Sequence, residues 1–404
     1  DLEAKAVLIR DADDKVHTVR SRSQEFFQRI NASVTAASEK EGDSGLEGKL
    51  RYYPESPVFK ENEYEVDSFR HSVGDLFEAL GNLAMSLADV SPGRLAEKDE
   101  TRLDIERPKI DLEAVIADLG FLVEAAGRNV FWFEFDEDEG SSRFVRIQSA
   151  PLDVAERLAG GLYDRMETVI MTSATLTVAN DFSYIRGRLG LDLDHRDRVT
   201  EFIAASPFDH HRQAAVIVPS HMPSPKESDF IERTNEVVLA LADGVRRGML
   251  VLFTSRGHLH RSYNDLRDEF SRRGITLLAQ GFDGSRNAIL RRFREDVSSV
   301  LFGMDSFWEG VDVPGKALEI VVIVRLPFAV PTDPIVQAQI EEIERSGRNA
   351  FTGYSVPEAA IKLRQGAGRL IRHRNDRGAV IVLDSSIATA RYGGIFKRAI
   401  PGRT

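Results

Sequence analysis

From about residue 200 onward, short apolar runs alternate with segments of helical periodicity, and this alternation constrains the fold more than any other feature. Apolar strands of this kind are buried on both faces, which is typical of a parallel sheet covered by helices on both sides. An α/β fold is therefore predicted for this part of the chain. The predicted strands are Ala215–Val218, Met249–Phe253, Ser299–Gly303, Glu319–Val324 and Ala379–Leu383.

The first third of the chain follows a helical pattern instead. Apolar residues recur at helical spacing over Ser72–Val90 and again over Asp111–Ala126. From residue 129 the pattern becomes strand-like, because Asn129–Phe135 and Arg143–Gln148 flank an acidic turn. We also expect a strand over Thr168–Thr175, which is apolar and ends in small hydroxyl residues. A mainly helical domain is therefore predicted to precede the α/β part.

Length and charge limit the possible classes of function. The 404 residues suggest two or three domains, and the net charge of -11 argues against a uniformly basic coat for nucleic acid. Charge is uneven, however, since residues 245–300 hold eleven arginines against six acidic residues. This local excess indicates either solvated helix faces or a surface that follows phosphates. No apolar run reaches the roughly 18 residues that a membrane span needs, so no membrane role is expected.

The sequence contains no cysteine, which excludes disulfides, thiolate nucleophiles and cysteine-ligated metals within it and fits a cytoplasmic protein. The histidine pairs His210-His211 and His258-x-His260 lack further ligands at metal-binding spacing, so we expect no metal site. The chain starts at Asp1 without a methionine or a signal peptide, and we interpret it as cut from a longer protein.

The strongest candidate for chemistry lies near the C-terminus. Pro357 suits the first turn of a helix, and spacings of four and three would place Gln365, Arg369 and Arg372 on one helical face. Guanidinium groups match phosphate oxygens and stay charged, so two arginines there suit a polyphosphate. The two glycines between Gln365 and Arg369 would each cost about 1 kcal/mol in a helix interior, which indicates that something approaches this backbone closely. The alternative is an ordinary surface helix.

The segment Gly303–Gly315 is the second candidate, because it leaves a predicted strand and is rich in glycine, aromatic and carboxylate residues. Its end, Gly310–Ala317, matches most of a phosphate-binding P-loop, but we reject that match. Ala317 stands where a hydroxyl should bind magnesium, and Pro314 lacks a backbone donor that the phosphate cradle needs.

Two shorter segments carry weaker signals. Thr254, Ser255 and Arg256 follow a predicted strand and offer groups that commonly bond to phosphate oxygens. The hydroxyl residues that end the predicted strand Thr168–Thr175 are a similar but weaker signal, since such residues end many strands.

Taken in order, these four segments resemble the later motifs of superfamily 2 helicases, specifically those of the DinG/XPD-like branch. The resemblance covers about residues 150–400 and is weak for residues 1–128. The matching segments are Thr172–Thr175 with motif III, Leu252–Arg256 with motif IV, Phe307–Gly315 with motif V and Gln365–Arg372 with motif VI.

The resemblance implies two RecA-like domains that clamp ATP between them, with single-stranded DNA running across both. The first domain normally supplies the P-loop and a DEAH box, and neither occurs in this sequence. ATP and Mg²⁺ would then be held mainly by a missing N-terminal part, and the chain alone would be inactive. Residues 1–128 would be a helical arch-like insertion, 129–180 the remnant of the first RecA-like domain and 181–404 the second.

The resemblance also assigns roles to individual residues. Those expected to contact or sense the ATP phosphates are Gln365, Arg369 and Arg372, and those expected to line the nucleotide side of motif V are Glu309, Gly310 and Asp312. The expected coupling residues are Thr172, Ser173, Ala174 and Thr175, and the expected DNA contacts are Thr254, Ser255 and Arg256. The implied protein would be a monomeric 5′–3′ helicase that acts on single-stranded or forked DNA in DNA repair.

Two departures from the family pattern and two alternatives remain. Family members often carry arginine where this chain has Ser386. Many members also hold an iron–sulfur cluster, which is possible in the longer protein, but this sequence has no cysteines to bind one.

As an alternative to a motor, the chain would be a DNA-binding or regulatory module, or part of a helicase-like exonuclease.

Overall fold

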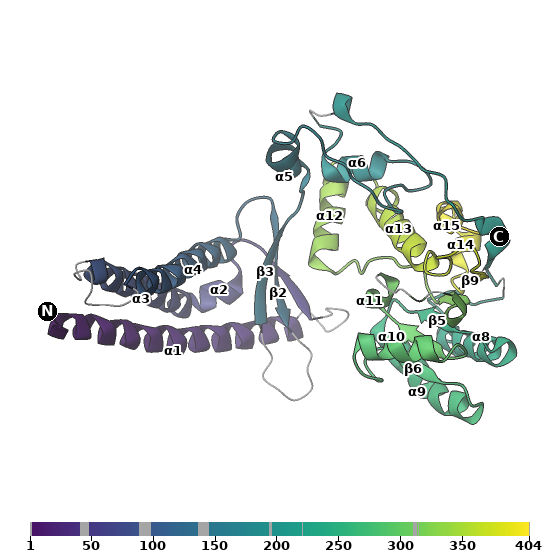
Figure 1. The fold of residues 1–404 in the computed structure, drawn as a ribbon, viewed down its shortest axis with the longest axis horizontal. Helices are drawn as coiled ribbons and strands as arrows, with labels where there is room; N and C mark the ends of the chain where they lie inside the picture. Colours follow the sequence, from purple (N-terminus) through teal and green to yellow (C-terminus); the bar gives the residue numbers. More distant parts are fainter. Residues whose placement is uncertain are drawn as a thin grey trace. The chain divides into compact units, whose positions relative to one another are not determined.

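A computed structural model describes residues 2–40, 48–88, 98–135, 145–193, 196–219, 221–309, 313 and 315–403. The chain forms two compact units, which are coloured by position along the sequence in Figure 1. Unit 1 comprises Asp1–Asp153 with Val330–Gln339, and unit 2 comprises Val154–Ala329 with Ile340–Thr404. In the described parts, no helix is both long and apolar enough to cross a membrane.

Unit 1 consists of helices and a small antiparallel sheet. The helix α3 packs against both α1 and α4, and aromatic residues including Phe26, Phe69 and Phe133 form the core (Figure 1). The helices are α1 (Leu2–Lys40), α2 (Pro57–Glu61), α3 (Glu63–Ala88) and α4 (Lys98–Glu124). The strands, in sheet order, are β1 (Lys49–Tyr52), β2 (Asn129–Phe135) and β3 (Val145–Pro151).

The sequence predictions for this unit are largely confirmed. Both predicted helices occur as parts of α3 and α4, and β2 pairs with β3 as an antiparallel hairpin. The acidic turn between the two strands lies outside the described residues. The assignment of residues 129–180 to a first RecA-like domain stays a prediction, as do the other proposed domain boundaries.

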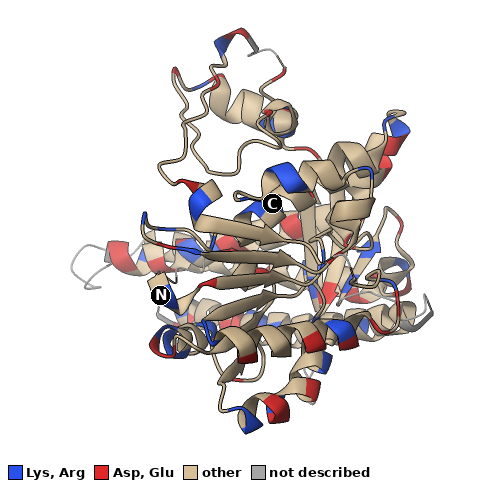
Figure 2. Cartoon of the chain, turned by 90° about the vertical axis from the view of Figure 1, so that its right-hand side faces the viewer, with Lys and Arg blue, Asp and Glu red and all other residues tan. Residues whose placement is uncertain are grey.

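Unit 2 is built on a six-stranded parallel sheet in the order β4-β9-β8-β5-β7-β6. All five predicted strands are confirmed, whereas β6 is too short to stand out in the sequence. The strands are β4 (Ala214–Ile217), β5 (Met249–Leu252), β6 (Leu277–Ala279), β7 (Val300–Gly303), β8 (Ile320–Ile323) and β9 (Gly378–Val382). These six strands carry no charged residue and appear tan in Figure 2.

Helices cover both faces of this sheet, as predicted. Side chains alternate along β5, so that Leu250 and Leu252 enter one core while Met249 and Val251 enter the other. The second core is covered by α8 (Phe230–Val245) and α9 (Arg256–Arg272). The first is covered by α10 (Arg286–Glu295), α13 (Val356–Ala367) and α15 (Gly393–Ala399). The α/β prediction is confirmed.

The remaining elements of the chain are short, apart from α12 (Pro334–Arg345), whose residues up to Gln339 belong to unit 1. The short helices are α5 (Ala155–Leu158), α6 (Ser183–Leu189), α7 (His210–Gln213), α11 (Asp305–Trp308) and α14 (Ser386–Thr389). Single turns of other helix types are η1 (Ala159–Tyr163), η2 (Arg196–Arg198), η3 (Gly315–Ala317) and η4 (Phe351–Ser355).

The predicted strand over Thr168–Thr175 is wrong. These residues belong to no strand or bridge of the described structure, and the Ile170 side chain is 82% exposed. A strand is stable only where neighbouring strands satisfy its backbone N–H and C=O groups, and no described strand pairs with this segment. Apolar composition alone therefore did not determine strand structure here.

Candidate functional site

Two loops that carry predicted motifs, those after β5 and β7, leave the sheet at the carboxyl ends of its strands. Leu252, which ends β5, pairs with Gly303 at the end of β7 and with Ile323 at the end of β8. Because these strands are parallel, the residues that follow them emerge side by side. Ligands of open α/β sheets bind beyond this edge, outside the carboxyl ends of the strands. The fold therefore brings together the loops after β5, β7 and β8.

The loop after β5 leads directly into α9. Ser255 is the N-cap residue of α9, and its hydroxyl oxygen accepts a hydrogen bond from the backbone N–H of His258 at 3.4 Å. Thr254 is half-buried, and Arg256 is exposed. The start of a helix directs N–H groups and a positive dipole outward, which favours phosphate oxygens. The three residues predicted to contact DNA thus share one helix start, which suits that role.

Trp308 connects the loop after β5 with α13. Its side chain is fully buried, and Nε1 donates a hydrogen bond to the carbonyl oxygen of Phe253 at 3.0 Å. Its ring atoms lie 2.7 and 2.9 Å from where a Cβ on Gly366 would stand. Its own carbonyl oxygen accepts a hydrogen bond from Nε of Arg369 at 3.2 Å. The expected close approach to this glycine is therefore made by an indole ring, and sequence reasoning missed that role of Trp308.

The helix predicted from Pro357 is confirmed, but it ends before the arginines. Gly368 is the C-cap residue of α13. The backbone N–H groups of Arg369 and Leu370 then bond to carbonyl oxygens three residues back, at 3.2 and 3.3 Å. Such bonds tighten the last turn and end the α-helix.

Arg369 and Arg372 consequently lie beyond α13, so the prediction that they share a helical face with Gln365 is wrong. The chain leaves the direction of α13 because Leu370 and Ile371 are buried in the core that α10, α13 and α15 cover. Gln365, near the end of α13, is half-buried, as are both arginines. Half-buried guanidinium groups keep some access to solvent and therefore to a ligand.

Two buried polar residues fix the turn that carries Arg372. Asp376 Oδ2 accepts hydrogen bonds from the backbone N–H groups of Arg372 at 2.9 Å and His373 at 2.8 Å. Gln213, which directly precedes β4, donates through Nε2 to the carbonyl oxygens of residues 373, 374 and 376. Sequence reasoning missed both residues, because Gln213 lies far from this turn in the chain and neither belongs to a motif.

The segment predicted to couple ATP hydrolysis to DNA movement is followed by a residue that bonds to α13. Thr172, Ser173 and Ala174 are exposed, while the hydroxyls of Ser173 and Thr175 lie 3.1 Å apart. Thr177, two residues further on, accepts a hydrogen bond at its Oγ1 from Nη1 of Arg364 at 3.3 Å. Arg364 immediately precedes Gln365, so the segment is tied to the helix that leads to the arginines.

The loop after β7 is described as far as Glu309. The side chain of Glu309 is exposed, and its carbonyl oxygen accepts a hydrogen bond from Nη2 of Arg286 at 3.1 Å. Gly310 and Asp312, the other residues predicted for the nucleotide side, lie outside the described residues. Their role stays a prediction.

The serine that replaces the expected arginine has its own partner. Asp384 Oδ1 accepts hydrogen bonds from both the backbone N–H and the hydroxyl of Ser386, at 3.0 and 2.5 Å. Asp384 Oδ2 accepts a further bond from the backbone N–H of Leu326 at 2.9 Å. The aspartate therefore ties the chain after β9 to the chain after β8.

His258 and His210 are both partly buried. Burial, and then the charges of Arg325 and Arg261, lower the pKa of His258. Burial, and then the charge of Arg364, lower the pKa of His210. Among the described residues, no group of three or more histidine and carboxylate side chains could hold a metal ion.

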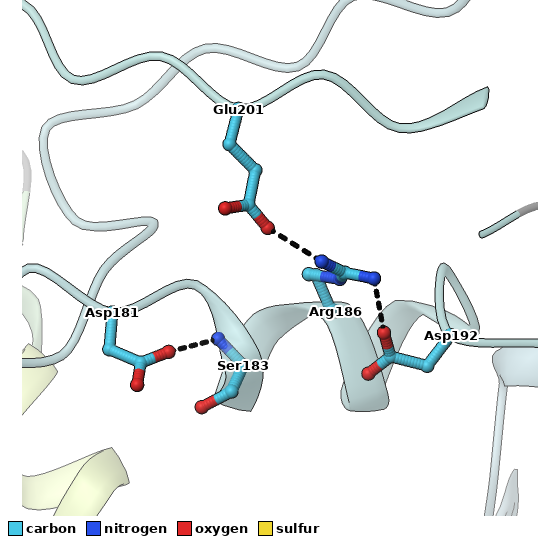
Figure 3. Close-up of a pocket in the computed structure, with 5 residues that line it drawn as sticks. All are labelled: Asp181, Ser183, Arg186, Asp192 and Glu201. Carbon is cyan, nitrogen blue, oxygen red and sulfur yellow. Dashed lines mark hydrogen bonds and ion pairs between the residues drawn. The ribbon is translucent and has the colours of Figure 1, made fainter. Parts of the chain in front are cut away.

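A hollow of about 430 Å³ lies elsewhere on unit 2, lined by Asp181, Ser183, Arg186, Asp192 and Glu201 (Figure 3). Arg186 pairs with Asp192 at 2.6 Å and with Glu201 at 2.9 Å. Asp181 instead accepts a hydrogen bond from the backbone N–H of Ser183, so three carboxylates and one guanidinium group line the hollow. This excess of negative charge disfavours phosphates, so the hollow does not compete with the sheet edge as a nucleotide site.

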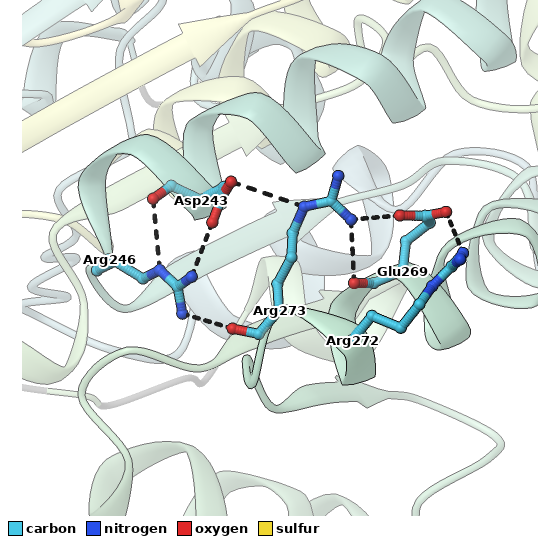
Figure 4. A network of polar contacts seen from close by, with 5 residues as sticks. All are labelled: Asp243, Arg246, Glu269, Arg272 and Arg273. Atoms are coloured by element: carbon cyan, nitrogen blue, oxygen red, sulfur yellow. Dashed lines mark hydrogen bonds and ion pairs between the residues drawn. The ribbon is translucent and has the colours of Figure 1, made fainter.

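The basic stretch over residues 245–300 divides into two parts. At the ends of α8 and α9, Arg246 and Arg273 pair with Asp243 while Arg272 and Arg273 pair with Glu269 (Figure 4). These helix ends lead back to the amino ends of the strands, away from the loops described above. The arginines there form intramolecular ion pairs, whereas Arg256 at the start of α9 lies at the loop edge.

Comparison with known families identifies one domain type. A family model described as "Helicase C-terminal domain" matches residues 238–403, which include β5 to β9 and the arginine turn.

Several curated proteins are similar to this chain. The "3'-5' exonuclease DinG" of Bacillus subtilis is 39% identical over 67% of this chain and 29% of its own length. The "ATP-dependent helicase DinG" of Mycobacterium tuberculosis is 38% identical over 68% of this chain and 40% of its own length. The "ATP-dependent DNA helicase DinG" of Photobacterium profundum is 32% identical over 84% of this chain and 47% of its own length. The chain thus spans less than half the length of these relatives.

Among solved structures, Xpd4 of S. tokodaii resembles this chain with a TM-score of 0.52. The match covers 98% of this chain and 70% of that one at 13% sequence identity. At this identity the likeness concerns the fold, and it agrees with a RecA-like sheet combined with a helical insertion.

Proposed function

The chain belongs to the DinG/XPD-like family of superfamily 2 helicases, of which it is a C-terminal part, and from this premise we propose that it completes the motor of an ATP-dependent DNA helicase. In this proposal it supplies arginines to ATP and part of the track for single-stranded DNA. The observation that carries the proposal is the connection made by Trp308, which contacts the loop after β5 and the segment that holds Arg369.

In the proposed motor, Arg369 and Arg372 contact the ATP phosphates while Gln365 links them to the coupling segment. Two half-exposed guanidinium groups on a fixed turn fit a polyphosphate, because they stay charged and present paired donors. Glu309, with the neighbouring Gly310 and Asp312, would line the nucleotide side. The P-loop and DEAH box that would hold ATP and Mg²⁺ do not occur in these 404 residues.

The proposed DNA track runs along the start of α9. Thr254, Ser255 and Arg256 would bind the DNA backbone, as their position at a helix start supports. The segment Thr172–Thr175 would couple hydrolysis to movement, which the bond between the nearby Thr177 and Arg364 of α13 supports. We further propose 5′–3′ translocation by a monomer on single-stranded or forked DNA.

Arg372→Ala in the whole protein tests the nucleotide role. We expect DNA-stimulated phosphate release to fall roughly 1000-fold or more, since an arginine that stabilises the transferred phosphate contributes on that scale. DNA affinity, measured by fluorescence anisotropy, should stay unchanged. Arg374→Ala is the matched control, because Arg374 lies in the same turn with an exposed side chain and has no assigned role. Normal turnover by Arg372→Ala would remove this residue from the ATP site.

The similarity to the "3'-5' exonuclease DinG" of B. subtilis favours a second candidate, in which the whole protein also degrades DNA from a 3′ end. Digestion of 3′-labelled single-stranded DNA tests it. If nuclease activity occurs and survives Arg372→Ala, the nuclease works independently of the proposed ATP site. A whole protein that binds DNA without ATPase or nuclease activity would instead support a module without a motor.

A further inference from the structure

One face of α9 carries both basic and aromatic side chains. Arg256, His260, Tyr263 and Arg267 follow one another at spacings of four, three and four, so they lie on the same side of the helix. This side is not the one that packs on the sheet, because the buried residues of α9 are Leu259, Ser262, Leu266 and Phe270. Arg256, His260 and Arg267 are exposed on this face, whereas Tyr263 is partly buried and packs against the core at its border.

Phe282, in the loop after β6, completes an aromatic cluster on this face. Its ring stacks on Tyr263 with centroids 4.1 Å apart and planes 22° from parallel. His260 meets the same ring edge-on at 4.8 Å. Phe282 nevertheless keeps 39% of its surface exposed. An exposed ring held by stacking needs no rearrangement before a flat ligand can pack against it.

The loop that presents Phe282 is held in place on both sides. Gly281 has a φ of +88°, a left-handed conformation that favours glycine. Asp283 Oδ2 accepts a hydrogen bond from the backbone N–H of Ala279 at 2.8 Å. Gln280 Oε1 accepts another from the backbone N–H of Met304, at 2.9 Å, which ties the loop to the start of the loop after β7. The ring is therefore presented by an ordered loop at the same sheet edge as the predicted motifs.

Charged groups of both signs lie near the cluster. Burial, and then the charge of Asp283, raise the pKa of Tyr263, while the nearby charges of Arg267 and Arg292 act in the opposite direction. The negative charge of Asp283 is partly neutralised, because Arg292 lies 3.7 Å from its carboxylate. Aromatic rings between cations suit single-stranded nucleic acid, whose bases stack on rings while its phosphates attract arginine.

We propose that Phe282 and Tyr263 form a platform on which a base of single-stranded DNA stacks, with Arg256 and Arg267 beside it to contact the phosphates. This inference rests on the proposed function, because it extends the track that starts at Thr254 and Ser255. It adds a contact with a base to contacts that otherwise concern only the backbone. Paired bases of a duplex are stacked on each other and do not offer a free face, so the platform selects single strands.

The test compares two probes on the 404-residue chain, a labelled oligo-dT and an abasic oligomer of equal length and charge. Fluorescence anisotropy gives both affinities. Phe282→Ala should weaken binding of oligo-dT roughly 5- to 150-fold, the range seen for loss of one aromatic–base contact. It should leave binding of the abasic oligomer unchanged, because phosphates do not need the ring.

Two further variants separate stacking from folding. Phe282→Tyr keeps a ring and should bind oligo-dT like the unaltered chain, whereas Phe282→Leu keeps an apolar side chain without a ring and should bind weakly. Val297→Ala, which removes an exposed apolar side chain at the other end of α10, should change neither affinity. Circular dichroism confirms that each variant is folded.

The outcomes distinguish the platform from the track on which it depends. The platform would be overturned if Phe282→Ala lost affinity equally for oligo-dT and for the abasic oligomer. It would also be overturned if Phe282→Leu bound oligo-dT as tightly as the unaltered chain. In either case the proposed track would remain. If the unaltered chain binds neither probe, the proposed DNA track fails together with the platform. Preference for a double-stranded probe over oligo-dT would also overturn the proposal.

Discussion

At the scale of single residues, close packing explains why position 366 is a glycine. Gly366 and Trp308 lie in different motifs and come into direct contact, because an indole ring occupies the space of the missing side chain. The same indole binds the backbone of Phe253. This glycine is therefore required by the fold, whether or not a nucleotide also approaches.

Gly366→Ala should destabilise unit 2, although alanine favours helices over glycine by about 1 kcal/mol. Its Cβ would lie 2.7 Å from the Trp308 ring and 3.1 Å from the side chain of Leu252. Overpacking of this kind costs about 1–3 kcal/mol, which exceeds the gain in propensity. Urea unfolding followed by circular dichroism measures the change.

Gly244→Ala is the control for this prediction, because a Cβ on this glycine of α8 would meet no atom within 4 Å. We expect it to leave the free energy of unfolding unchanged or to raise it by about 0.5–1 kcal/mol. Equal effects of the two substitutions would show that Trp308 does not restrict position 366.

At the scale of elements, helix ends carry most of the site. The end of α13 sends the arginines onto a turn fixed by Asp376 and Gln213, and the start of α9 presents the residues predicted to contact DNA. His258, in the first turn of α9, has its Nδ1 buried without a hydrogen-bond partner among the described residues. Its environment therefore makes the start of α9 sensitive to pH.

Acidification should weaken unit 2 through His258. Its folded pKa is lowered from 6.5, so the unfolded chain binds the proton more readily. The stability that its neutral form contributes is fully present above pH 6.5 and is lost as pH falls from there toward the lowered value. Urea midpoints of the unaltered chain and of His258→Gln, compared between about pH 7 and about pH 5.5, measure this difference. The variant should lose less stability on acidification; parallel curves would exclude His258 as a cause.

At the scale of the whole molecule, the two units fold around separate cores. The aromatic core of unit 1 joins its long helices to the antiparallel sheet, whereas two apolar cores enclose the parallel sheet of unit 2. The residues proposed to contact ATP all belong to unit 2. In the proposed motor their arginines would contact the phosphates, but the sequence includes no P-loop to hold those phosphates.

The 404 residues should therefore show no appreciable ATP hydrolysis of their own, with or without single-stranded DNA. No group in the sequence matches the residues that hold magnesium and the β-phosphate in such motors. A phosphate-release assay measures this, with the whole protein as the positive control. DNA-stimulated turnover by these residues alone would contradict the proposal.

The sequence by itself determined the α/β class, five of the six parallel strands and the order of the four motifs. It could do so because strand burial and helical periodicity are local patterns, and because the motif residues are close together in the chain. The hairpin of unit 1 was predictable for the same reason, since its two strands are neighbours in sequence.

Only the tertiary structure decided where α13 ends, that Thr168–Thr175 is not a strand, and which residues hold Arg369 and Arg372. Each of these depends on partners that are distant in the chain. Burial of Leu370 and Ile371 ends the helical course, and the bonds from Gln213 and Asp376 fix the turn that follows. Periodicity describes which face of a segment is apolar, but packing decides what that face meets and therefore where the segment stops.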